Sequence, residues 1–148
     1  MNAVNIILET KRLILKQPIL SDFDGLLQLR TDPQVMQYIG TGDIQTENQV
    51  KEFIENAKLY SDEYGLGFYS VFEKETNDFI GQAGLFHLGF NVNQPDIELA
   101  YILHTKYWNK GYATELANFS RETIELQIEN GYQTTRKIVE KTPNISMM

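Results

Sequence analysis

The chain has 148 residues, of which 42% are hydrophobic and 22% charged, a composition typical of one globular domain spanning residues 1–148. It contains no cysteine, which excludes disulfide bonds, a thiolate metal site and a cysteine nucleophile. With two histidines, a metal site built by the protein is not expected. The net charge of −7 disfavours a nucleic-acid-binding surface and favours a cationic substrate, such as an amine.

No uninterrupted apolar stretch approaches the roughly 20 residues that a membrane helix requires, so we expect no membrane span and no membrane partner. The N-terminus lacks the basic segment, apolar core and small-residue cleavage site of a secretory signal. We therefore expect a cytoplasmic protein.

The first part of the chain predicts a strand and then a helix. Residues 8–17 begin polar and then alternate apolar with polar side chains, which indicates one strand buried mainly on one face. Ser21 or Asp22 is suited to cap a helix that Asp32-Pro33 interrupts. The stem of Arg30 recurs at helical spacing with the apolar residues of this helix.

A second helix and an antiparallel group of strands are predicted next. Thr46-x-x-Gln49 has the pattern of a capping box ahead of a helix that Gly65 would end. Strand-like runs follow at residues 68–74 and 79–90, with good hairpin-turn residues between them. A third antiparallel partner is predicted at residues 96–104.

Residues 107–114 join this last strand to an amphipathic helix through a tight turn that contains Gly111. The first backbone N–H groups of a helix have no intrahelical partners, and the helix dipole places partial positive charge there. An anion such as phosphate can supply the missing acceptors, and Gly111 and small Ala113 leave the backbone accessible. The alternative is a glycine required only by the turn, with no ligand.

The helix after Gly111 keeps apolar and small residues on one stripe, and Asn130-Gly131 supplies its stop signal. Residues 134–141 have the pattern of another short strand. We find no internal repeat, low-complexity segment or linker.

The runs 97–103 and 107–115 together resemble the central signature of the GNAT acyl-CoA N-acyltransferases. They are most similar to the branch of the ribosomal-protein N-terminal acetyltransferases, where Tyr-Trp-x-Lys-Gly-Tyr-Ala-Thr is typical. The resemblance implies an α+β or α/β fold with a mixed, mostly antiparallel central sheet flanked by helices. It also implies two splayed strands at the cofactor cleft, here 96–104 and 134–141.

The same resemblance implies which residues bind acetyl-CoA. The amides of the strand end would contact the acetyl and pantetheine portions: Tyr101, Ile102 and Leu103. The amides of the turn would hold the pyrophosphate: Asn109, Lys110, Gly111, Tyr112, Ala113 and Thr114. The Lys110 side chain is a candidate for a further phosphate contact, or else it is simply solvated. Trp108 departs from the Gln or Arg that is common three residues before the glycine in this family.

Three side chains are candidates for the acceptor side of the site. Glu98 is the candidate general base, directly or through a water, unless it merely faces solvent on a half-buried strand. His87 is a candidate to receive a proton or orient an amine, and Phe86 to line the substrate pocket. Histidines and aromatic residues on strands are also common structural residues, which is the alternative for both.

The end of the family pattern is missing after the last long helix. Residues 142–146 are a partial echo of a Pro-x-Asn-x-x-Ser turn, and Asn144 is the candidate for its pantetheine contact. Either the chain is shortened relative to its relatives or a partner subunit completes the sheet. An unpaired strand at 134–141 would be an exposed edge, so we expect a homodimer.

The sequence therefore predicts an N-acetyltransferase that moves an acetyl group from acetyl-CoA directly to a primary amine. The acceptor is a protein N-terminus or a small molecule, because fold analogy does not transfer substrate choice. Two alternatives remain: a non-catalytic acyl-CoA-binding or regulatory protein that has lost its C-terminal half-site, and a structural fragment with neither function.

Overall fold

The strands of the protein form one mixed sheet in the order β1 to β6. The computed structural model describes residues 7–39, 41–65, 67–93, 97–118 and 146–147. The strands are β1 (Ile7–Glu9), β2 (Leu13–Lys16), β3 (Gly67–Glu73), β4 (Phe79–His87), β5 (Ile97–Leu103) and β6 (Ser146–Met147). Neighbours from β1 to β5 are antiparallel, and β6 runs parallel to β5. The predicted mixed, mostly antiparallel sheet is confirmed.

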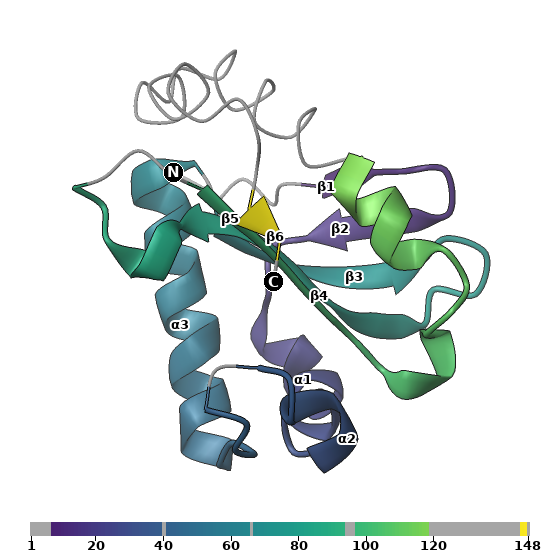
Figure 1. Ribbon diagram of the computed structural model, residues 1–148, viewed down its shortest axis with the longest axis horizontal. Coiled ribbons are helices and arrows are strands. Elements are labelled where there is room, and N and C mark those ends of the chain that lie inside the picture. Colours follow the sequence, from purple (N-terminus) through teal and green to yellow (C-terminus); the bar gives the residue numbers. More distant parts are fainter. Residues whose placement is uncertain (1–6, 40, 66, 94–96, 119–145, 148) are drawn as a thin grey trace.

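Helices cover both faces of this sheet (Figure 1). On one face lie α1 (Phe23–Arg30), α2 (Pro33–Met36) and α3 (Glu47–Tyr64). On the other lies the helix that begins at residue 112 and is described as far as residue 118. Short 3₁₀ turns lead into α1 (Leu20–Asp22), follow β4 (Leu88–Phe90) and follow β5 (Thr105–Tyr107).

The buried side chains separate into clusters on the two faces. Under the helix that begins at residue 112, Tyr112 and Leu116 pack on Leu13, Leu15 and Val71 of the sheet. Under α1 to α3, the buried residues include Leu26, Leu29, Val35, Val50, Ile54 and Ile102. Strand β5 contributes to both clusters, through Leu103 on one face and Ile102 on the other.

The capping signals predicted for α3 are confirmed. Thr46 accepts a hydrogen bond from the Gln49 amide at 3.2 Å, and the Gln49 side chain accepts one from the Thr46 amide at 2.8 Å. Gly65 ends the helix in the left-handed conformation, with φ of 70°. Local sequence decides both ends of this helix.

The prediction of one strand over residues 8–17 is wrong, because the chain reverses between β1 and β2. The carboxylate of Glu115 accepts hydrogen bonds from the Thr10 hydroxyl and, at 2.9 Å, from the Arg12 amide. The Thr10 amide also bonds the Leu13 carbonyl at 2.9 Å, which closes the turn. A partner that lies 103 residues away along the chain leaves no mark in the local pattern.

The strand predicted at 79–90 ends earlier, at His87, because Gly89 and Phe90 adopt φ of 63° and 58° and curl into a 3₁₀ turn. The strand predicted at 134–141 lies outside the described residues, so the homodimer and the splayed strand pair remain predictions. None of the helices in the described part of the chain is both long and apolar enough to cross a bilayer.

Gly81 allows β4 and β5 to approach each other unusually closely. A Cβ atom on Gly81 would lie 2.1 Å from the carbonyl oxygen of Ile102 and 2.9 Å from the Cα of Leu103. Its φ of 156° is also rare for residues with side chains. Because the obstructing atoms belong to the backbone, any side chain at this position must push β5 away.

We predict that Gly81→Ala lowers the free energy of unfolding by about 3 kcal/mol or more, because the backbone of β5 must shift. Gly89→Ala is the matched control, since Gly89 has φ of 63° but a Cβ atom there would have no neighbour within 4 Å. It should cost about 1 kcal/mol. Urea denaturation followed by circular dichroism measures both, and equal losses would contradict this account of Gly81.

Candidate active site

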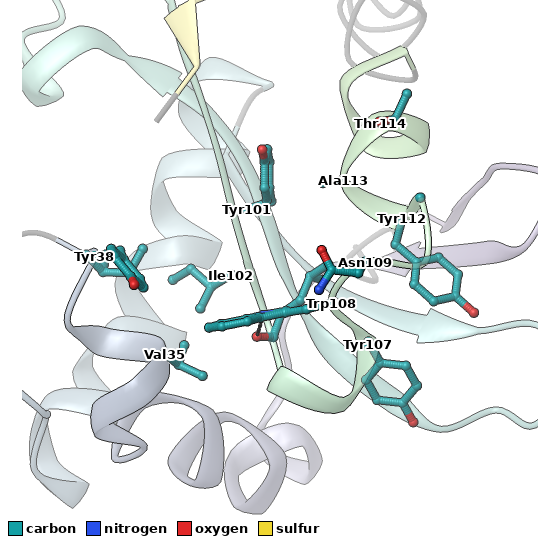
Figure 2. Close-up of a pocket in the computed structure, with 13 residues that line it drawn as sticks. Val35, Tyr38, Tyr101, Ile102, Tyr107, Trp108, Asn109, Tyr112, Ala113 and Thr114 are labelled. Carbon is teal, nitrogen blue, oxygen red and sulfur yellow. Dashed lines mark hydrogen bonds between the residues drawn. The ribbon is translucent and has the colours of Figure 1, made fainter.

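A cavity of about 540 Å³ lies where the end of β5 meets the turn before the helix at residue 112. We call it the turn cavity; its lining is Val35, Tyr38, Ile39, Tyr101, Ile102, Leu103, Tyr107, Trp108, Asn109, Gly111, Tyr112, Ala113 and Thr114. Figure 2 shows Val35 and Tyr38 on one side and Tyr107 and Tyr112 on the other, with the Trp108 indole between them. The fold thus brings the end of β5 and the predicted phosphate turn to one cavity.

The turn presents backbone amides to this cavity. The Gly111 carbonyl accepts the first intrahelical bond, from the Glu115 amide at 3.1 Å. The amides of residues 112–114 precede that donor, so they have no partner within the helix. Asn109 and Gly111 adopt φ of 60° and 81°, which bend the chain into the turn. The helix dipole adds partial positive charge, so the wall suits an anion.

Arg12 and Glu115 hold the turn in place. The Nε of Arg12 pairs with Oε1 of Glu115 at 2.7 Å, and its Nη1 donates to the Lys110 carbonyl at 2.9 Å. The guanidinium carbon also lies 4.2 Å from the centroid of the Tyr112 ring. Tyr112 is fixed in turn by its hydroxyl, which donates to the Glu73 carboxylate at 2.5 Å. The predicted phosphate turn is therefore tied to the turn between β1 and β2, through Arg12, and to β3, through Glu73.

The ionisation of these groups follows from the same contacts. Burial alone would raise the pKa of Glu115, but hydrogen bonds from Thr10 and Arg12 and the Arg12 charge lower it overall. The hydrogen bond to Glu73, with burial, raises the pKa of the Tyr112 phenol to about 12. At neutral pH the carboxylate of Glu115 is charged and the Tyr112 phenol is neutral.

Beside the turn cavity, the outer edge of β5 is unpaired with any strand of the described residues. The His104 amide donates to the Ile80 carbonyl at 2.9 Å. In the antiparallel register, the backbone groups of Tyr101 and Leu103 therefore point away from β4. Within the described residues, β6 pairs with β5 only at Glu98 and Leu99. Beyond these two residues, no described strand pairs with this edge. The Trp108 indole N–H donates a hydrogen bond to the Leu103 carbonyl at 2.8 Å.

A second cavity, of about 520 Å³, lies between the sheet and the helices α1 and α3. We call it the aromatic cavity; its lining is Arg30, Ile39, Gln45, Phe53, Asn56, Ala57, Tyr60, Phe68, Phe86, Phe90, Glu98, Ala100 and Ile102. Ile39 and Ile102 line both cavities, so the two meet at these side chains. The predicted residues Glu98 and Phe86 thus line a different cavity from the predicted phosphate turn.

Glu98 projects into the aromatic cavity from β5. Its strand has no bulge opposite β4, so Glu98, Ala100 and Ile102 share one face, as the alternation predicts. The Glu98 side chain is half-buried, and Phe86 lies opposite it on β4. The carboxylate is therefore placed to meet a ligand that enters this cavity.

His87 lies behind the wall of the aromatic cavity, not on it. It is 1% exposed, and its Nδ1 forms a hydrogen bond with the hydroxyl of Tyr60. Its amide donates to the same hydroxyl oxygen at 2.8 Å, so the phenol proton is directed at Nδ1. Burial lowers the pKa of His87 and raises that of Tyr60 to about 12. A neutral histidine thus orients Tyr60, which does line the cavity.

Arg30 is a cavity residue whose role sequence reasoning missed. It is 5% exposed, its Nε donates to Oε1 of Gln82 at 2.8 Å, and its guanidinium lies 4.0 Å from the centroid of the Phe53 ring. The available signal was a cation on the apolar face of a predicted helix. Gln45, Asn56 and Tyr60 also line the cavity, and no sequence signal marked them.

The remaining predicted residues are not gathered into either cavity. Lys110 is exposed and does not line the turn cavity; its Nζ lies 5.8 Å from the centroid of the Tyr107 ring. Asn144 lies outside the described residues. Among the residues that are described, no group of three or more His, Cys, Asp or Glu side chains is arranged to hold a metal ion.

The family profile described as an acetyltransferase (GNAT) domain matches residues 12–134. The chain belongs to the GNAT acetyltransferase family. It is 32% identical over 111 residues to the uncharacterized N-acetyltransferase p20 of Bacillus licheniformis, covering 73% of this chain and 60% of that protein. The chain spans between 50% and 61% of the length of the curated relatives that it matches.

Solved GNAT structures share the fold of this chain. A GNAT-family acetyltransferase from Bacillus anthracis superposes with a TM-score of 0.67 at 20% identity, covering 90% of this chain and 82% of that one. RimL, a ribosomal-protein α-N-acetyltransferase in complex with coenzyme A, superposes with a TM-score of 0.62 at 14% identity. This second superposition covers 80% of this chain and 68% of RimL. At these identities the likeness establishes the fold.

We predict that Glu115→Gln destabilises the protein by about 1–2 kcal/mol at pH 7 and by much less in acid. Folding lowers the pKa of Glu115. Its ionised carboxylate therefore stabilises the fold at pH values above 4.5, the ordinary pKa of this group. That contribution is lost as pH falls through the folded-state pKa. Urea denaturation midpoints of both proteins, measured from pH 7 down to about pH 3, should therefore converge in acid.

The control for Glu115→Gln is Asp62→Asn, which removes an exposed carboxylate paired with Lys58 at 2.9 Å one helical turn away. Exposed pairs of this kind contribute little, so its midpoint should stay close to that of the unchanged protein. If Glu115→Gln lowered the stability equally at every pH, the shape of the side chain, and not its charge, would be what matters at this position.

Proposed function

We propose that this GNAT-family protein transfers an acetyl group from acetyl-CoA directly to a primary amine. The observation that carries the proposal is that the turn cavity and the aromatic cavity meet at Ile39 and Ile102. One cavity has the backbone donors that an anionic cofactor needs, and the other has a carboxylate that can receive a proton. Direct transfer requires that donor and acceptor be held side by side, and we propose that this occurs beside the two shared residues.

The turn cavity suits coenzyme A in its chemistry. The amides of residues 112–114 would hold the pyrophosphate, with the helix dipole favouring its charge. The outward backbone groups of Tyr101 and the outward amide of Leu103 can bond the amide groups of a pantetheine arm, as an edge strand would. Acetyl-CoA, when bound, supplies an activated thioester, and the protein's task is to position it.

The aromatic cavity would receive the amine. Glu98 accepts a proton from the amine, directly or through a water, as the nitrogen forms its bond to the acetyl carbon. The carbon–sulfur bond breaks in the same exchange, and the departing thiolate takes up a proton. Phe86 forms part of the wall that excludes water, and His87 acts by orienting Tyr60.

We predict that acetyl-CoA binds in the turn cavity and that Gly111→Val weakens this binding at least tenfold, measured by isothermal titration calorimetry. The branched side chain conflicts with φ of 81° and obstructs the amides. Gly42→Val is the control, because Gly42 has a similar φ of 84° and lies outside both cavities. Equal weakening by both variants would place the cofactor elsewhere.

We predict that Glu98→Gln slows CoA release by about 100-fold or more and leaves acetyl-CoA affinity unchanged, because only proton transfer is lost. Thiol release with a panel of primary amines measures the rate. Glu55→Gln, an exposed position on α3 outside both cavities, is the control and should behave like the unchanged protein. Acetyl-CoA binding with no CoA release from any amine would favour a non-catalytic acyl-CoA-binding protein.

A further inference from the structure

The aromatic cavity contains a buried cation for which the described part of the chain supplies no counter-charge. Arg30 is 5% exposed, yet no carboxylate among the described residues lies within ion-pair distance of it. Its partners in the described part of the chain are the neutral amide of Gln82 and the face of the Phe53 ring. Burying an uncompensated charge is strongly unfavourable, and these contacts offset part of that cost.

Arg30 keeps its charge despite its position. Burial lowers the pKa of the guanidinium to about 10, which leaves it protonated at neutral pH. A guanidinium presents its N–H groups as a planar fork that matches a carboxylate. Because Arg30 lines the cavity, a ligand there can supply the negative charge that the described residues do not.

Two glutamine side chains that belong to residues in contact with Arg30 each have one buried atom with no hydrogen-bond partner among the described residues. The Oε1 atom of Gln45 and the Nε2 atom of Gln82 are buried and form no hydrogen bond within the described residues. Gln45 lines the cavity, and its backbone amide donates to the Arg30 carbonyl at 2.9 Å. Unsatisfied buried polar atoms are rare in folded proteins. Gln82 does not line the cavity, so Gln45 is the one of the two that a polar ligand in the cavity can meet.

The other walls of the cavity are aromatic. The rings of Phe86 and Phe90 stack with centroids 4.7 Å apart, and Phe68 stacks on Phe86 at 5.0 Å. Phe53 contacts Phe68 edge to face at 4.9 Å. These walls suit an apolar or aromatic group of a ligand.

We propose that the acceptor is a small zwitterion, a free amino acid with an apolar or aromatic side chain, whose carboxylate binds Arg30. Its ammonium group would face Glu98, which lines the same cavity but is not paired with Arg30. A protein N-terminus has a neutral amide in place of this carboxylate, so it leaves Arg30 uncompensated. This inference rests on the proposed function, in which the amine enters the aromatic cavity.

The reaction then balances as an ordinary acyl transfer. The ammonium first loses one proton to water through Glu98, which gives the neutral amine. The nitrogen then bonds the acetyl carbon and the carbon–sulfur bond breaks. Glu98 accepts the second nitrogen proton, which balances the proton that the departing thiolate takes up. The products are the N-acetyl amino acid and free CoA thiol, with one proton released to water.

The test compares phenylalanine with 2-phenylethylamine, which lacks only the carboxylate. Affinity for each is measured by ligand-observed NMR, and CoA release is measured with each as acceptor. The unchanged protein should bind phenylalanine about 10- to 100-fold more tightly than 2-phenylethylamine, and should release CoA faster with phenylalanine by a similar factor. Equal affinities in the unchanged protein would overturn the inference without requiring any variant to fold.

Arg30→Gln should raise the KM for phenylalanine about 10- to 100-fold and leave that for 2-phenylethylamine unchanged. Arg30→Lys, which keeps the charge, should restore part of the preference. Lys51→Gln is the control for lost positive charge, since Lys51 is exposed on α3 outside both cavities, and it should change neither value.

The outcomes separate this inference from the proposed function. CoA release from both amines with no dependence on Arg30 would overturn the inference and leave the acetyltransferase proposal standing. Arg30-dependent binding of phenylalanine with no CoA release from either compound would support the zwitterion site and contradict the proposed catalysis.

Discussion

The close approach of Gly81 to the Ile102 carbonyl fixes the position of β5, and both cavities depend on that strand. Strand alternation turns Tyr101 and Leu103 toward the turn cavity and Glu98 and Ala100 toward the aromatic cavity. Ile102 lines both. A displacement of β5 would therefore change the walls of both cavities together, which is why Gly81 matters although it lines neither of them.

The charged side chains at the two cavities differ in whether they are paired with each other. Beside the turn cavity, Glu115 and Arg12 neutralise each other and also tie the turn to the first hairpin, so the backbone amides are left as the groups that attract an anion. In the aromatic cavity, Arg30 and Glu98 have no partner among the described charged groups. This difference is why we propose a phosphate for one cavity and a zwitterion for the other.

Local patterns predicted the elements whose causes are local. The capping box at Thr46, the stop at Gly65 and the antiparallel run of β3 to β5 follow from neighbouring residues. The reversal at Thr10 could not be predicted, because its partner is Glu115. The same limit applies to the site: the turn carries its own signal, whereas Arg30 becomes a cavity residue only when α1 packs against the sheet.

The most direct test is a crystal structure of the chain bound to a bisubstrate analogue, in which coenzyme A is joined through an acetyl linker to the amino group of phenylalanine. We expect the pyrophosphate at the amides of residues 112–114, the linker beside Ile102 and the carboxylate at Arg30. The account would be contradicted if the pyrophosphate lay away from the turn, or if the phenylalanine portion lay outside the aromatic cavity. Either result would show that the donor and acceptor sites do not meet at β5.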